Sequence, residues 1–263
     1  MFYSVICTLC VHSAVDSGKL PPIATIIGLM IKILMISAWL LLVHTIALLA
    51  IFDTDLLYRI DRKLGTGLLN PPEITQYHED MLGSQLQLDS SVEAGSVIFL
   101  GDSLTQGLNV AAVTHPAINY GIGMDTSAAL LGRIGQYQSL TKASAIVVEI
   151  GINDLIRTSR SNAQIVENIQ QILDSLPDQV PVIVQSVFPV DERFGMTGFN
   201  QRIRTLNAAI ADLAASQSFE FLDLHDAFAD EDGNLKDELH TGDGIHLSAA
   251  AYQQWISSLK ERL

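Results

Sequence analysis

The sequence is poor in cysteine and in basic residues, and each shortage excludes a class of protein. Its two cysteines, Cys7 and Cys10, precede residue 11, so the rest of the chain holds neither a disulfide framework nor a cysteine nucleophile. Lysine and arginine total 15 against 29 acidic residues, which gives a formal net charge of −14. The chain therefore lacks the basic face with which a nucleic-acid-binding protein neutralises phosphates, and we expect no nucleic acid among its partners.

Metal-binding patterns are also lacking. The histidines show none of the spacings typical of metal ligands, such as HExxH. The DEDGN stretch at 230–234 resembles part of a calcium loop, but the first and twelfth positions of that loop are Phe228 and Leu239, which cannot bind calcium. We expect no metal ion and no cofactor.

One long apolar run is present near the N-terminus. The 20 residues Ile33 to Phe52 carry no formal charge and reach about 30 Å as a helix, the hydrocarbon thickness of a bilayer. The run extends back to Ile23. A secretory signal has a shorter apolar region and a small-x-small cleavage site, which this run does not offer. We predict an N-terminal tail at 1–22, a transmembrane anchor at 23–52, a polar connector at 53–95 and a globular domain at 96–263.

The orientation of this anchor depends on two opposing arguments. Arg59, Arg62 and Lys63 follow the span, whereas only Lys19 and Lys32 precede it. Taken literally, this positive-inside count places the C-terminal domain in the cytosol. A lone N-terminal apolar segment, however, commonly exports the domain on its C-terminal side. Of the two orientations we favour an extracytoplasmic, periplasmic C-terminal domain.

From residue 96 onward, short apolar runs alternate with amphipathic stretches. The amphipathic stretches include 165–176 and 203–213, whose apolar residues share one helical face, and a last helix is expected over 248–263. Such alternation predicts an α/β domain in which a parallel sheet is covered by helices on both faces. The expected strands are 97–100, 117–120, 145–150, 180–187 and 219–224.

Polar residues follow these strands at the positions where open parallel sheets bind ligands, outside the carboxyl ends of the strands. The first strand leads into Gly101-Asp102-Ser103 and the third into Gly151-Ile152-Asn153. The second leads into GIGMDT at 121–126, and the fifth is followed, just before the last helix, by GDGIHLS at 242–248. These groups are of the kind used in acyl transfer.

The ordered set of GDSL at 101–104, GIND at 151–154 and DGIH at 243–246 resembles the GDSL (SGNH) hydrolase family of esterases and lipases. The similarity covers residues 96–263, and its style is closest to the platelet-activating-factor acetylhydrolase-like and carbohydrate-esterase branches. The resemblance implies a flavodoxin-like three-layer α/β sandwich with a five-stranded parallel sheet.

The family pattern identifies three residues as a candidate catalytic triad. Ser103 is the expected nucleophile, and its hydroxyl needs a base within hydrogen-bond reach. His246 is that base, and Asp243, three residues earlier, orients the imidazole and stabilises its charged form. Asp102 is expected to hold the loop rather than to take part in the chemistry.

An oxyanion hole must supply hydrogen-bond donors to the tetrahedral intermediate. The Ser103 backbone N–H and the Asn153 side-chain amide are expected to serve. The third donor is a backbone N–H of the second block. Relatives carry glycine immediately before the Asp-Thr pair, where this chain has Met124. A positive φ strains a methionine, so either Met124 or Gly123 supplies this donor.

Two other features lie near this candidate site. The DERFGMTGF segment at 191–199 is expected either to line an acyl pocket or close over it, or to be a loop whose aromatic residues anchor it to the core. His240 is expected to be a solvent-exposed loop histidine or to line the pocket.

The function expected from these features is that of a membrane-anchored serine hydrolase. It would cleave carboxylic esters of lipids, sugars or small molecules through an acyl-serine intermediate, and its partners would be that ester substrate and the membrane. Two alternatives stay open. One is an acyltransferase that moves the acyl group to an envelope sugar or lipid hydroxyl, and the other is a non-catalytic membrane-anchored scaffold.

Overall fold

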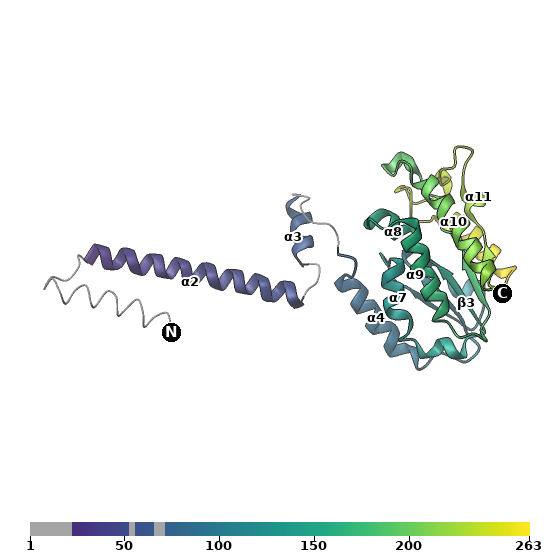
Figure 1. The fold of residues 1–263 in the computed structure, drawn as a ribbon, viewed down its shortest axis with the longest axis horizontal. Coiled ribbons are helices and arrows are strands. Elements are labelled where there is room, and N and C mark those ends of the chain that lie inside the picture. The colour runs from purple at the N-terminus through teal and green to yellow at the C-terminus, as the bar shows by residue number, and fades with distance from the viewer. Residues whose placement is uncertain (1–22, 53–55, 66–71) are drawn as a thin grey trace. The chain divides into compact units, whose positions relative to one another are not determined.

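The computed structural model describes residues 23–52, 56–65 and 72–263, which fall into two compact units, Met1–Leu57 and Tyr58–Leu263. In the first unit, α2 (Ile23–Phe52) is one continuous helix (Figure 1). Its stretch Ile23–Leu48 is long and apolar enough to cross a membrane, and no part of it is buried. A signal sequence meets the same test of length and composition.

The second unit is built on a parallel sheet. Within the described residues the sheet has five strands in the order β2-β1-β3-β4-β5, and every pairing is parallel. The expected α/β architecture and all five expected strands are therefore confirmed, although β4 and β5 are shorter than predicted. The strands are β1 (Val97–Gly101), β2 (Ala117–Gly121), β3 (Ala145–Glu149), β4 (Val182–Gln185) and β5 (Glu220–Leu222).

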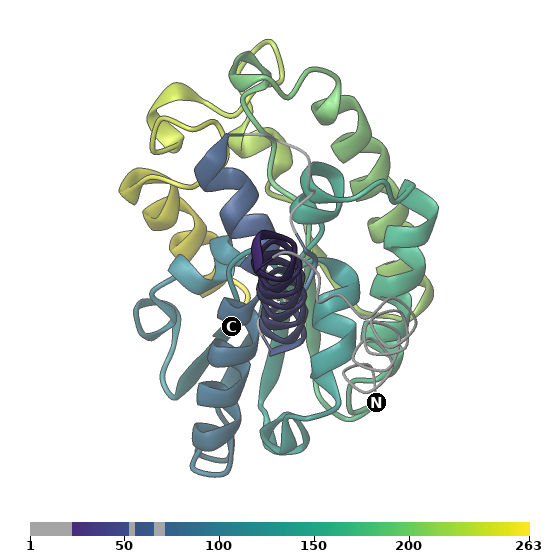
Figure 2. The ribbon, with the colours of Figure 1, turned by 90° about the vertical axis from the view of Figure 1, so that its left-hand side faces the viewer.

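Helices cover both faces of this sheet, and alternate strand residues explain why. In β1, Ile98 and Leu100 join the core beneath α7 (Ser127–Ile134), α9 (Asn162–Asp174) and α10 (Phe199–Ser216). Val97 and Phe99 join the core on the other face, beneath α5 (Ser103–Gly107), α6 (Val110–Val113) and α12 (Ala249–Lys260). In Figure 2 the yellow C-terminal helix and the green helices lie on opposite sides of the sheet. The longer helices are α7 (Ser127–Ile134), α9 (Asn162–Asp174), α10 (Phe199–Ser216) and α12 (Ala249–Lys260).

Shorter helices follow the strand ends and carry much of the candidate site. The α-helices are α5 (Ser103–Gly107), α6 (Val110–Val113), α8 (Ile152–Arg157) and α11 (His225–Phe228), and the 3₁₀ helices are η1 (Gln138–Lys142), η2 (Glu192–Phe194) and η3 (Asp237–Leu239).

The range predicted as a connector contributes two helices, α3 (Leu56–Leu64) and α4 (Gln76–Asp89). Leu82 and Leu86 of α4 pack against the core beneath α7 and α9. Buried polar groups attach the same helix, since Gln85 accepts a hydrogen bond from Tyr137 and Asp89 accepts one from Tyr120. Residues from 72 onward therefore belong to the compact unit rather than to a free linker.

The packing predicts how two leucine-to-alanine substitutions in helices will differ. Leu206 of α10 is fully buried, whereas Leu88 of α4 is 59% exposed. We expect Leu206→Ala to lower the free energy of unfolding by roughly 2–5 kcal/mol, because it leaves a cavity in the core. Leu88→Ala should change it by less than about 0.5 kcal/mol. Urea denaturation of the two variants measures this, and equal losses would contradict the assignment of α10 to the core.

Candidate active site

Ser103 stands where the first strand turns into a helix. β1 ends at Gly101, and a Cβ at that position would lie 2.2 Å from the Thr105 hydroxyl and 2.3 Å from the Glu149 carbonyl oxygen. Only glycine fits there. Asp102 then caps α5, because its carboxylate accepts a hydrogen bond of 2.9 Å from the Leu104 N–H. The strand ends on glycine because the Thr105 side chain and the β3 backbone approach it closely, and the chain then enters α5 with Ser103 at the carboxyl end of the sheet.

The structure brings the three predicted triad residues together. Ser103 Oγ lies 3.2 Å from His246 Nε2, and His246 Nδ1 lies 2.6 Å from Asp243 Oδ2. Both distances allow hydrogen bonds. The side chains of His246 and Asp243 are 52% and 47% exposed, so the group is open to solvent.

Asp243 stays ionised because backbone and side-chain donors surround it. Its Oδ1 accepts hydrogen bonds from the N–H groups of Ile245 at 3.0 Å and of His246 at 2.9 Å. Partial burial raises the pKa of Asp243, but these hydrogen bonds and the His246 ring outweigh burial and hold the pKa below its ordinary value. A carboxylate in this state can stabilise a positive charge on the neighbouring ring.

The candidate oxyanion donors lie on three neighbouring strand ends. The Asn153 side-chain amide donates to two acceptors, the Asp125 carbonyl oxygen at 3.0 Å and Asp102 Oδ2 at 3.3 Å, so one of these bonds must give way, the longer one first, before the amide can donate to an oxyanion. The Gly123 N–H already donates to Gln106 Oε1 at 2.8 Å. The Met124 N–H donates to no acceptor among the described residues. Of the two alternatives for the third donor, the geometry favours Met124.

The backbone of Met124 adopts a left-handed conformation, which favours glycine, the residue expected at this position from the family pattern. Its φ is +70°, in the left-handed region, which costs a residue with a Cβ about 1–2 kcal/mol. Arg157 holds this turn in place by donating to the Met124 carbonyl oxygen and, at 2.6 Å, to the Pro72 carbonyl oxygen. The strain is therefore supported by contacts from α8 and from the segment before α4.

A buried network beneath this turn was not expected from the sequence. Asp125 is 1% exposed and accepts from Arg133 Nε at 2.7 Å, while His78 Nδ1 lies 2.6 Å from its other oxygen. Nearby, Tyr77 accepts a hydrogen bond from the Gln106 amide. His78 and Tyr77 belong to α4, and no motif or spacing connects them to the strand ends. The only sequence signal was a charged residue, Arg133, in an otherwise apolar helix.

Two further acids lie buried behind the nucleophile. Asp102 and Glu149 are 0% and 1% exposed, and Glu149 Oε1 has no hydrogen-bond partner among the described residues. Burial, together with the charges of Asp125 and Asp154, raises the pKa of Asp102 to about 7, and burial beside Asp102 raises the pKa of Glu149 well above its ordinary value. Asp102 accepts hydrogen bonds from the Leu104 N–H and the Asn153 amide, contacts that fit the expected role of holding the loop.

The 191–199 segment divides its apolar residues between the core and the surface. Met196 is buried in the core and Phe199 packs against it, so these two anchor the loop. Phe194 is 50% exposed and its ring contacts the edge of the His240 ring. The His240 side chain is only 5% exposed, so the expectation of a solvent-exposed histidine is wrong.

Asp191, Asp237 and His240 lie close enough to one another to hold a metal ion. The hydrogen bonds argue against such a site. His240 Nδ1 accepts hydrogen bonds from two backbone N–H groups, so a neutral ring carries its proton on Nε2, the nitrogen that faces the acids. Arg193 already pairs with both carboxylates. The cluster is an ion-pair network rather than a metal-ligand set.

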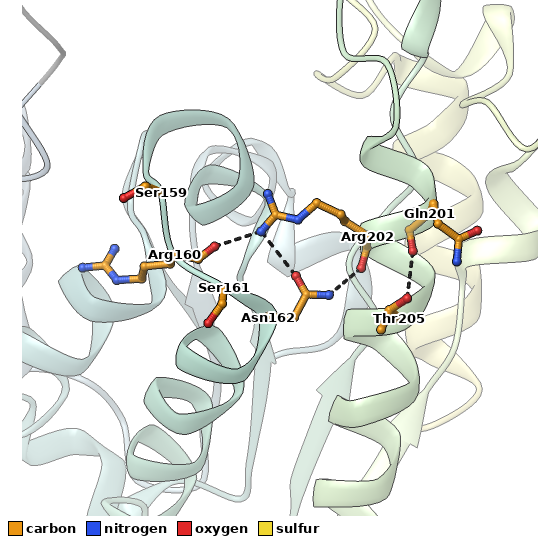
Figure 3. A pocket seen from close by; sticks show the side chains of 7 residues that line it. All are labelled: Ser159, Arg160, Ser161, Asn162, Gln201, Arg202 and Thr205. Atoms are coloured by element: carbon orange, nitrogen blue, oxygen red, sulfur yellow. Dashed lines mark hydrogen bonds between the residues drawn. The ribbon is translucent and has the colours of Figure 1, made fainter.

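A surface hollow of about 460 Å³ lies near the start of α9, between Arg160 and Arg202. Figure 3 shows that the Arg202 guanidinium extends toward the backbone of Arg160, where it donates to the carbonyl oxygen at 2.8 Å, whereas the Arg160 side chain extends away from Arg202. Arg160 itself pairs with Glu73 at 2.6 Å. None of the candidate triad or oxyanion residues lines this hollow, and we assign no chemistry to it.

Comparison with known proteins identifies relatives. Residues 99–254 match the model of the GDSL-like lipase/acylhydrolase family. No curated protein matches the chain.

Solved structures share the fold. A Streptococcus pneumonia protein, provisionally described as a platelet activating factor, is 26% identical with a TM-score of 0.66, over 71% of this chain and 92% of that one. A GDSL-like lipase from Bacteroides thetaiotaomicron is 20% identical with a TM-score of 0.61, over 69% and 96%. An acetylxylan esterase from Geobacillus stearothermophilus is 18% identical with a TM-score of 0.53, over 64% and 94%.

The buried acid pair predicts an unusual dependence of stability on pH. A group whose pKa is raised on folding stabilises the folded state below its unfolded pKa, and this contribution is lost as the pH rises through the folded pKa. For Asp102 the window runs from 3.8 to about 7. We therefore expect the free energy of unfolding to fall between these pH values, by up to about 1.4 kcal/mol per pH unit for one proton.

Glu149→Gln tests this prediction, because it removes one of the two charges and keeps the shape. The variant should lose the part of the slope that Glu149 contributes, while Asp102 keeps the part caused by its own burial, and the variant should be more stable than the wild type at pH 8. Urea denaturation at a series of pH values measures both. Parallel curves for the two proteins would show that the pair does not share the cost of ionisation.

Proposed function

The chain belongs to the GDSL-like lipase/acylhydrolase family, and we propose that it is a membrane-anchored serine hydrolase that cleaves carboxylic esters through an acyl intermediate on Ser103. Carboxylic ester hydrolysis follows from the family. The identity of the catalytic residues, the anchor and the acyl intermediate are our proposals. The observation that carries them is the aligned contact of Ser103 Oγ with His246 Nε2 at 3.2 Å and of His246 Nδ1 with Asp243 Oδ2 at 2.6 Å.

The first half of the proposed reaction forms the acyl-enzyme. Ser103 Oγ attacks the ester carbonyl carbon while its proton passes to His246 Nε2, and Asp243 stabilises the resulting imidazolium. Negative charge develops on the former carbonyl oxygen. The tetrahedral intermediate then collapses, the carbon–oxygen bond to the alcohol breaks, and His246 returns its proton to the departing alcohol.

The second half releases the acid. Water attacks the acyl carbon, gives its proton to His246 Nε2, and the second tetrahedral intermediate expels Ser103 Oγ, which takes the proton back. In both halves the proposed oxyanion donors are the backbone N–H groups of Ser103 and Met124 and the Asn153 amide. Ser103 opens α5, where backbone N–H groups have no partner within the helix.

The proposed anchor is α2. Its apolar side chains are exposed all round, as shown by three consecutive residues that point in different directions, Leu34 at 73%, Met35 at 66% and Ile36 at 60%. A helix without a polar face gains nothing from water and requires an apolar surrounding. α3, which begins four residues after α2 ends, adds support because Ile60 and Leu64 are exposed while Asp61 is buried. An amphipathic helix with its apolar face outward is typical of a membrane interface.

The proposed triad and oxyanion hole predict the activity of three variants. Ser103→Ala should abolish hydrolysis of p-nitrophenyl esters. Asn153→Ala should lower kcat by about 10²–10³-fold, because one donor is lost from the transition state. Met124→Gly should keep kcat within about threefold, since the proposed donor is its backbone N–H. Initial rates on esters from acetyl to palmitoyl measure all three and report the preferred acyl length.

Asn109→Ala is the matched control, because Asn109 is exposed and its side chain makes no capping hydrogen bond. Wild-type rates in Ser103→Ala would refute the nucleophile. Acyl transfer to an added alcohol in preference to water would favour the acyltransferase. A folded wild-type protein without turnover or acylation would favour a scaffold.

We also propose that the catalytic unit is extracytoplasmic, and the cysteine distribution provides a test. Cys7 and Cys10 are the only cysteines and both precede α2. In a Cys7→Ser/Cys10→Ser background, Ser257→Cys adds one thiol at an exposed position of α12. A membrane-impermeant maleimide should label this variant in intact cells and should label the wild type only after the cells are broken. The reverse pattern would place the catalytic unit in the cytosol, as the positive-inside count does.

A further inference from the structure

The loop between η3 and α12 carries both Asp243 and His246, yet packing does little to hold either side chain. About half of each side chain is exposed. The glycines on either side of Asp243 have positive φ, +100° at Gly242 and +76° at Gly244. Glycine also has more conformational freedom in the unfolded chain than other residues, so ordering this loop costs more entropy. Ile245 packs against the core and Leu247 is buried in it, so packing holds the end of the loop next to α12, whereas hydrogen bonds hold the stretch around Asp243.

One imidazole supplies two of these hydrogen bonds. His240 Nδ1 accepts from the N–H of Gly242 at 3.0 Å and from the N–H of Gly244 at 3.3 Å. The carbonyl oxygen of Gly244 in turn accepts from the Asp191 N–H at 2.8 Å. The backbone on both sides of Asp243 is thus attached to the pair formed by His240 and Asp191.

The His240 ring is buried beside Asp191, although its Nε2 makes no hydrogen bond among the described residues. Its side chain is 5% exposed, and Nε2 lies 3.4 Å from Asp191 Oδ2. Asp191 is fully buried and accepts hydrogen bonds from the backbone N–H, Nε and Nη2 of Arg193, at 3.0, 2.7 and 2.8 Å. The ring of Phe194 covers His240 edge-on, with centroids 5.3 Å apart.

These contacts determine the tautomer of His240. A backbone N–H cannot give up its proton, so the nitrogen that accepts from two of them carries none. The proton of the neutral ring is therefore on Nε2, which faces the Asp191 carboxylate. Asp191 favours this tautomer, and this tautomer leaves Nδ1 free to accept from the loop.

We propose that His240 is a positioning residue for the reaction: through Nδ1 it holds the loop that sets Asp243 against His246. This inference rests on the proposed function only in its kinetic consequence, because the hydrogen bonds themselves are measurable without turnover. Among the described residues the His240 side chain makes no hydrogen bond to the side chains of Ser103, Asp243 or His246. It acts by keeping Asp243 Oδ2 within 2.6 Å of His246 Nδ1.

Two amide side chains separate the roles of the two ring nitrogens. In His240→Asn the amide oxygen can occupy the place of Nδ1, whereas in His240→Gln the amide lies near the place of Nε2 and the acceptor for the loop is lost. His240→Ala loses both. We expect kcat of His240→Asn to stay within about threefold of the wild type, and kcat of the Gln and Ala variants to fall by roughly 10–100-fold, since small displacements of a catalytic group are costly.

The kinetic pattern distinguishes positioning from a general loss of structure. KM for p-nitrophenyl acetate should change less than kcat. The acid limb of the pH profile of kcat/KM should move to lower pH in the Gln and Ala variants, because the imidazolium loses its carboxylate partner. The labelling rate of Ser103 by a fluorophosphonate should follow kcat. Equal kcat values in the Asn and Gln variants would overturn the proposal.

Amide hydrogen exchange of the full chain in detergent tests the hydrogen bonds independently of activity. The N–H groups of Gly242 and Gly244 should be protected in the wild type and in His240→Asn, and should exchange faster in His240→Gln. Absence of this difference would overturn the proposal whatever the kinetics show. If the exchange pattern holds but wild-type Ser103 is neither labelled nor acylated, then the proposed function fails and the structural role of His240 stands.

Discussion

One buried carboxylate connects the strand ends on which the candidate site is built. Asp102 caps α5 through the Leu104 N–H and, with its other oxygen, accepts from the Asn153 amide. β1 and β3 are neighbours in the sheet, so this side chain spans the step between the nucleophile turn and the proposed oxyanion donor. The same Asn153 amide also bonds the Asp125 carbonyl oxygen after β2. Burial of Asp102 beside Glu149 is the cost of linking three strand ends through so few atoms.

The sequence predicted the fold well because sheet and helix leave periodic traces. Five apolar strands, the flanking helices and the order of the GDSL, GIND and DGIH motifs were all local signals. The supporting contacts were not local. His78 contacts Asp125, 47 residues away in the sequence, and Gln106 accepts a hydrogen bond from the Gly123 N–H, 17 residues away. The burial of His240 was not predicted for a different reason. It depends on Asp191 and Phe194, and no sequence pattern indicates that these residues lie beside His240.

Met124 illustrates how the surroundings maintain an unfavourable backbone. A left-handed methionine persists only where neighbouring contacts determine its conformation. Here Arg157 binds its carbonyl oxygen, and the next residue, Asp125, is held by Arg133 and His78. The strained residue is Met124, and the contacts that stabilise it are made to its own carbonyl oxygen and to the side chain of the next residue, Asp125. A substitution of Arg157, Arg133 or His78 would therefore shift the Met124 N–H, although none of these three side chains is itself a proposed oxyanion donor.

The attachment of α4 has a consequence for the boundary of the module. The family match begins at residue 99, yet residues of α4 support the site. Tyr77 accepts a hydrogen bond from Gln106, and His78 contacts Asp125. Asp89 accepts hydrogen bonds from Ser139 and Tyr120. The folded unit that contains the candidate site is therefore longer than the stretch that matches the family model. A chimera joined at residue 96 would contain Ser103 but would lack α4 and its contacts, whereas a chimera joined near residue 72 would contain both.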